Sequence, residues 1–395
     1  MRGFALLLSM TVFAFPALAV DRVTVQQLEL TVAAAHGKPD KEVAQRLGDV
    51  ELTERLSTAR LERLQRDLPG EKARVALLAL GDASAFLDLP ATDLLPDAPP
   101  DLATQGRIMS RAMDFVIATI SKMPNFIATR TIVRFQDLKV SQTFRETIVV
   151  RKSSFDFVDR SSATVLYRNG REVVEPPKSK KAGDSMNSSA GLTNWGLFGP
   201  LLGVVMADVL KNKMGWSHWE QGITGPLAVF RYQVAEDRSN YTVRFCCFLG
   251  EHGMMRDFEG VPQYHGDIAV DPKSGAVLRL VVKTELGPKI PIDRADVMVE
   301  YGPVDIGGKS YVCPVKSVSI STATTLVFHK VVPNSNPEYN EVVDEPKVTA
   351  INDIFFDNYH VFRTEMRILP PKDEDPKGNS SEPAPTAPPA ASPQR

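Results

Sequence analysis

The fold is decided by residues 263–318, a stretch that begins QYHGDIAV-DPKSG-AVLRLVV over residues 263–282. Two runs rich in β-branched residues flank a short loop that contains Pro272 and Gly275. Proline fixes φ at about −65° and glycine tolerates a positive φ, so both residues favour a tight turn. The pattern therefore predicts a β-hairpin.

The same stretch continues as a meander. Strands are predicted at 295–301 and 311–320, on either side of a turn at Gly307-Gly308. A second tight turn is predicted at Asn169-Gly170. Trp216 and Trp219 are three residues apart on a predicted strand, so we expect their side chains on opposite faces. The other predicted strands are 127–135, 143–150, 154–159, 163–167, 216–221, 227–235, 241–249 and 351–368.

With this strand order, the chain resembles the periplasmic lipoprotein carriers and sensors of the LolA, LolB and RseB type over residues 101–368. The resemblance implies an α+β fold in which a curved antiparallel half-barrel wraps an apolar cavity, with a helix in the concave face. The inserts at 175–210 and 332–348 depart from the small carriers. The whole chain also resembles a group of exported proteins of soil bacteria, a likeness that implies no activity.

The first residues have the features of a secretory signal. Met1-Arg2 is followed by an apolar run too short to span a bilayer and by Ala17-Leu18-Ala19. We expect cleavage after Ala19 and a periplasmic or secreted protein with no transmembrane span in the mature chain. A net charge of −2 and a pI near 6.3 give no electrostatic case for nucleic-acid binding.

Composition divides the mature chain into four parts. Residues 20–90 are rich in helix formers and predict a helical layer, and residues 91–100 form a Pro-rich linker. The half-barrel domain follows at 101–369, and a disordered Pro-rich tail occupies 370–395. Because the linker marks a boundary, we expect the helical layer to be separable from the sheet.

The candidate ligand residues lie on two apolar segments. Residues 102–122 predict an amphipathic helix, and residues 192–210 predict a Gly-hinged segment followed by a helix from Pro200. We interpret the second segment as a lid over the open mouth of the half-barrel. The alternative is that its side chains complete the core. The lid or cavity candidates are Trp195, Leu197, Phe198, Leu201, Leu202, Val205 and Phe115.

The sequence carries no catalytic or metal-binding signature. The densest titratable cluster, around His252 and His265, matches no metal-ligand spacing. No cofactor is expected. Adjacent residues on a strand point to opposite faces, so we do not expect a bond between Cys246 and Cys247. Either one of them pairs with Cys313, or all three cysteines are small buried residues.

The sequence thus predicts a non-enzymatic binding protein for a lipid, an acyl chain or a lipoprotein. The alternative is an envelope module for protein interaction or sensing, with a filled barrel and no ligand. The ligand, the partner and the oligomeric state do not follow from the sequence.

Overall fold

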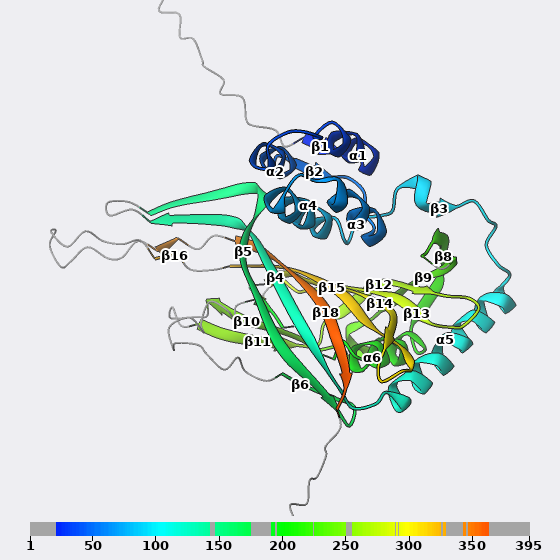
Figure 1. Ribbon diagram of the computed structural model, residues 1–395. Helices are drawn as coiled ribbons and strands as arrows, with labels where there is room; N and C mark the ends of the chain where they lie inside the picture. The colour runs from blue at the N-terminus through cyan, green and yellow to red at the C-terminus, as the bar shows by residue number, and fades with distance from the viewer. Residues whose placement is uncertain are drawn as a thin grey trace, which may run out of the picture. The chain divides into compact units, whose positions relative to one another are not determined.

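The computed structural model describes residues 21–142, 147–174, 191–193, 196–223, 225–249, 255–288, 290, 292–324, 327–328, 343–344 and 347–362. The predicted signal peptide, the predicted tail, residues 175–190 of the first insert and Trp195 lie outside these residues. Residues up to Phe362 belong to one compact unit, which is described below (Figure 1).

The N-terminal part is a helical layer, as predicted. Thr24 caps its first helix through a capping box with Gln27. Two three-residue strands pair in parallel between the helices. The elements are β1 (Asp21–Val23), α1 (Val25–Ala33), α2 (Asp40–Gly48), β2 (Val50–Leu52), α3 (Thr58–Asp67) and α4 (Glu71–Ala83).

The Pro-rich linker lies against the sheet. It forms a short 3₁₀ turn at Ala91–Asp93 and the two-residue strand β3 (Leu94–Leu95), which pairs with β8. The indole of Trp219 donates to the carbonyl of Ala98 at 3.1 Å. The helical layer and the sheet are therefore joined along the linker as well as by their packed faces.

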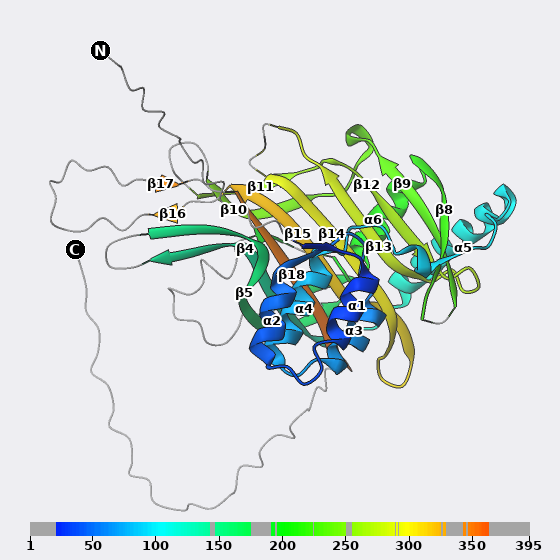
Figure 2. The ribbon, with the colours of Figure 1, turned by 90° about the horizontal axis from the view of Figure 1, so that it is seen from above.

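The sheet has eleven strands in the order β3-β8-β9-β12-β13-β14-β15-β18-β4-β5-β6, and neighbouring strands are antiparallel. It curves without closing, so the predicted α+β half-barrel is confirmed (Figures 1 and 2). The strands are β4 (Phe126–Gln142), β5 (Thr147–Arg168), β6 (Arg171–Val174), β8 (Lys213–Gln221), β9 (Pro226–Val234), β12 (Gln263–Val270), β13 (Val277–Glu285), β14 (Ile292–Asp305), β15 (Ser310–Thr324) and β18 (Lys347–Val361).

The predicted hairpin connects β12 and β13. The N–H of Asp271 donates to the carbonyl of Ala276 at 2.9 Å, and Gly275 has a φ of +79°. A Cβ atom at Gly275 would lie 2.5 Å from the carbonyl oxygen of Arg111, so this glycine also permits close packing against the long helix α5 (Leu102–Lys122). The turns at Asn169-Gly170 and Gly307-Gly308 also have positive φ angles, as predicted.

Each face of the sheet supports its own hydrophobic core because side chains alternate along a strand. On β13, Leu280 and Val282 belong to the core around α5 and α6 (Pro200–Val209), whereas Val281 belongs to the core under the helical layer. Met298 on β14 also faces the helical layer. Helices α1–α4 thus cover one face, and α5 and α6 lie on the concave face (Figure 1).

Small elements flank the main sheet. A three-stranded sheet, β11-β10-β7, consists of β7 (Gly191–Leu192), β10 (Val243–Leu249) and β11 (Met255–Gly260). Two short strands, β16 (Val327–Phe328) and β17 (Val343–Asp344), pair with each other. A 3₁₀ turn at Glu236–Arg238 follows β9.

Three sequence predictions are corrected. The predicted strands within 147–167 are one long strand, β5. Trp216 and Trp219 do not face opposite sides: a bulge between Trp216 and His218 adds a residue, and the indole rings meet at 4.8 Å. Cys313 is free and buried, so of the two alternatives for the cysteines the one with a bond to Cys313 is wrong. Cys246 is disulfide-bonded.

Candidate functional site on the concave face

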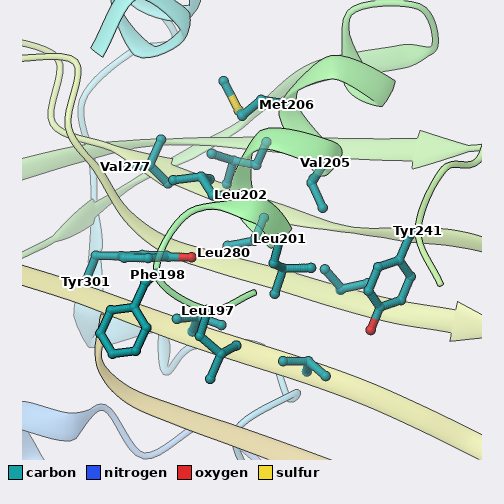
Figure 3. Close-up of a cluster of buried hydrophobic side chains, with 14 of the residues drawn as sticks. Leu197, Phe198, Leu201, Leu202, Val205, Met206, Tyr241, Val277, Leu280 and Tyr301 are labelled. Carbon is teal, nitrogen blue, oxygen red and sulfur yellow. The ribbon is translucent and has the colours of Figure 1, made fainter. Parts of the chain in front are cut away.

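The predicted lid residues lie inside the concave face rather than over its mouth. Five of the seven candidates are buried in one core: Leu197, Phe198, Leu201, Leu202 and Val205. Figure 3 shows them packed between α6 and the strands beneath it. Phe115 on α5 is half-buried, and Trp195 lies outside the described residues.

Phe198 is the anchor of this segment. Its ring lies 4.8 Å from the ring of Phe356 and 5.2 Å from that of Phe126, in edge-to-face geometry. The rings of Tyr167 and Tyr359 follow at 6.1 Å each. Edge-to-face pairs stabilise beyond simple area burial, so Phe198 holds the start of α6 against β4, β5 and β18.

A glycine-bent turn and a partly buried carboxyl group fix the chain before α6. Gly196 and Gly199 have φ angles of +67° and +152°, a region that other residues rarely adopt. The N–H of Phe198 donates to the Glu172 carboxylate at 2.9 Å. Burial raises the pKa of Glu172, and the backbone N–H groups of this turn act against that rise.

A second carboxyl group holds the other end of α6. Asp208 is buried and accepts hydrogen bonds from the Tyr264 hydroxyl at 2.9 Å and from the backbone N–H of Asn240 at 2.8 Å. Burial, with Asp208 beside it, raises the pKa of Tyr264 well above its usual value, so the hydroxyl stays protonated as a donor.

Little empty space remains around α6. A cavity of about 10 Å³ lies between α5, α6 and the sheet, lined in part by Phe115, Phe198 and Tyr301. One water molecule needs about that volume. At this position the described side chains leave room for about one water molecule, so a ligand chain would have to displace some of them there.

Two tyrosine hydroxyls near Phe198 have no hydrogen-bond partner among the described residues. They belong to Tyr167 and Tyr301, which are both buried. Burial, with the Glu172 charge nearby, raises the pKa of each hydroxyl. A buried hydroxyl without a partner costs free energy, and each of these two groups retains the capacity to donate one hydrogen bond and to accept others.

Two buried ionic clusters lie on the opposite face, where the helical layer meets the sheet. Lys316 on β15 lies 2.8 Å from Asp82 on α4 and 3.7 Å from Asp353 on β18. Glu220 on β8 accepts from Arg279 on β13 at 2.7 Å and lies 3.3 Å from Arg55.

Neither cluster was predicted from the sequence, although strand alternation carries a signal. Lys316 is in step with Val318 and Ile320, and Asp353 lies between Ile351 and Phe355, so both charges occupy positions that otherwise hold buried apolar residues. A charge at such a position predicts a partner, but it does not say which residue that partner is.

In the titratable cluster noted around His252 and His265, the described members His265 and Asp267 each pair with a different residue. His265 is partly exposed and pairs with Glu285 at 3.0 Å, and Asp267 pairs with Arg231 at 3.2 Å, while His252 lies outside the described residues. A shallow surface pocket of about 400 Å³ adjoins His265. Within the described ranges, no group of three or more acidic, histidine or cysteine side chains is placed to hold a metal ion.

In the part of the chain that the structure describes, every helix is too short or too polar to cross a membrane. Comparisons of the chain with family models, with curated proteins and with solved structures find no match.

Proposed function

We propose that this protein is an exported, non-enzymatic binding protein for a long apolar chain, such as the acyl chain of a lipid or lipoprotein. In this proposal the ligand takes the place of α6 on the concave face. The observation that carries it is α6 itself: a helix buried over most of its surface, attached through a glycine-bent turn and held by two polar anchors, Glu172 and Asp208.

The free energy lost when α6 leaves the concave face is similar to the free energy gained when an acyl chain takes its place. Burying an apolar side chain contributes about 1.5–3 kcal/mol, so the five buried apolar residues of α6 contribute roughly 8–15 kcal/mol. A chain of about 14 carbons regains roughly 11 kcal/mol at about 0.8 kcal/mol per CH₂. Long chains can therefore compete with α6, whereas short chains cannot.

The proposal predicts that weakening the seat of α6 improves binding. Gly196→Ala places a side chain at a φ of +67°, with its Cβ about 2.9 Å from Cβ of Pro200. This strain raises the free energy only of the state in which α6 is packed on the concave face. We therefore expect a lower melting temperature and a severalfold higher affinity for a fluorescent C16 fatty acid. Gly170→Ala is the matched control, since it has similar backbone strain but open space around it.

Lipid extraction and mass spectrometry of the protein purified from cells provide the independent test. A co-purified acyl lipid would support the proposal. If neither the parent nor Gly196→Ala binds the fatty acid, α6 is a fixed part of the core and the proposal fails.

That failure would leave the alternative, a protein-interaction or sensing module with a filled half-barrel. One observation favours it: the cavity beside α6 holds only about 10 Å³. The same titration distinguishes the two functions, because a filled module binds no fatty acid even when α6 is destabilised.

A further inference from the structure

A pocket larger than the cavity beside α6 lies on the opposite side of the sheet, between the helical layer and the strands. Its volume is about 270 Å³. An apolar cavity of about 150 Å³ is enough to bind benzene, and pockets for drug-sized ligands begin near 300 Å³. This space, which we call the interlayer pocket, has the size for a small organic molecule.

The sequence of α4 creates the interlayer pocket. Ala76, Ala79 and Ala83 all line it, and their spacing of three and four residues places them on one face of the helix. A side chain that ends at Cβ leaves space where leucine would fill it. Phe155 from β5 and Ile320 from β15 form the opposite wall.

One cation lies at this otherwise apolar wall. Nε of Arg294 donates to Asp296 at 2.6 Å, and the guanidinium lies 5.2 Å from the ring centre of Phe86. These contacts fix its plane, and a guanidinium has four more N–H groups on its Nη atoms for an acceptor. Arg294 is about one-third exposed, with 37% of its side chain accessible, so a ligand can reach it.

We propose that the interlayer pocket binds a medium-chain carboxylic acid, with its apolar chain along the alanine face of α4 and its carboxylate on Arg294. Arg294 provides a charge-assisted hydrogen bond for a planar carboxylate. Glu51, the other ionisable residue among those that line the pocket, is exposed and carries the opposite charge. The pocket therefore favours a monoanion over a dianion.

Calorimetric titration of the full mature protein with decanoate, and with decanol as its uncharged counterpart, tests this proposal. Ala76→Leu fills the pocket, so we expect at least tenfold weaker decanoate binding with an unchanged or higher melting temperature. Ala33→Leu, at an exposed position on α1, is the matched control and should bind like the parent. Arg294→Gln should weaken decanoate about tenfold and leave decanol unchanged.

The outcomes separate this site from the concave face. If Ala76→Leu binds decanoate like the parent, or the parent binds none, the interlayer pocket is not a ligand site. If Gly196→Ala changes decanoate affinity while Ala76→Leu does not, decanoate occupies the concave face, which overturns this proposal and leaves the proposed function intact.

Discussion

At the scale of single residues, the most consequential group is the buried carboxyl pair of Asp82 and Asp353 beside Lys316. All three side chains are 5% exposed or less. One ammonium cannot neutralise two carboxylates, and burial raises the pKa of both carboxyl groups, so one of the two is protonated in the folded protein. Burial, together with the Asp82 charge, raises the pKa of Asp353 far above its usual value, so Asp353 holds that proton.

This assignment makes stability depend on pH with a definite sign. In the unfolded chain Asp353 ionises near pH 3.9, whereas in the folded protein its pKa is higher. The folded state therefore binds the extra proton. The contribution of Asp353 to stability is fully present below about pH 3.9 and is lost as pH rises from there to the folded pKa.

Asp353→Asn replaces the protonated carboxyl by a neutral group of the same shape, so the variant should lack this pH dependence. We expect it to gain at least about 1 kcal/mol over the parent at pH 7, because each unit of raised pKa costs about 1.4 kcal/mol in the parent. Urea unfolding between pH 4 and pH 7 measures the difference. Lys316→Met is the contrasting variant and should lose about 3–5 kcal/mol, since it leaves buried carboxyl groups without their cation.

If the free energies of unfolding of the parent and Asp353→Asn change in parallel with pH, Asp353 ionises normally and the assignment fails.

No sequence pattern could have predicted this cluster in full. Lys316 and Asp82 are 234 residues apart, and Arg55 and Glu220 are 165 apart, so their pairing depends on how the helical layer docks. Alternation marks each charge as buried, and only the tertiary structure supplies its partner.

At the scale of elements, local chemistry explains which predictions succeeded. The hairpin at Gly275, the helix at Leu102–Lys122 and the helix that begins at Pro200 each depend on a few neighbouring residues. The Trp216 bulge was missed because it depends on pairing between β8 and β9. The position of α6 was left open between a lid and a part of the core, since an apolar segment can cover a cavity or fill it.

The β12–β13 turn gives a test of element packing. Gly275→Ala introduces strain at a φ of +79° and places Cβ 2.5 Å from the carbonyl oxygen of Arg111. Backbone strain of this kind costs about 1–3 kcal/mol, and the clash with α5 adds to it. We expect the free energy of unfolding, measured with urea, to fall by about 2–4 kcal/mol, with one part from backbone strain and the other from the clash with α5.

Gly308→Ala serves as the control, because its φ is +80° and nothing lies near its Cβ position. It should lose only the backbone share. Equal losses in the two variants would show that the turn does not press on α5, and the contact between the hairpin and the helix would then contribute little to stability.

At the scale of the whole molecule, the shared core changes what the Pro-rich linker implies. Composition suggested a boundary at residues 91–100 and a separable helical layer. Seven sheet residues nevertheless pack into the core of α1–α4: Val133, Phe135, Val281, Met298, Val318, Ile320 and Ile351. Composition along the chain detects a linker. It does not show that the helical layer before the linker packs on one face of the sheet after it.

The last prediction follows from that core and concerns a protein that begins at Asp101. Exposing seven buried apolar side chains costs about 10–20 kcal/mol at roughly 1.5–3 kcal/mol each, which matches or exceeds the usual net stability of about 5–15 kcal/mol. Lys316 would also lose its contact with Asp82, and Glu220 would lose its contact with Arg55. The remaining pair of Arg279 and Glu220 would then be exposed to water. We therefore expect the shortened protein to aggregate or to melt without cooperativity, and co-expression with residues 20–100 to restore a cooperative melt. A cooperative melt of the shortened protein alone would show that the sheet is independent and that the helical layer is an accessory to it.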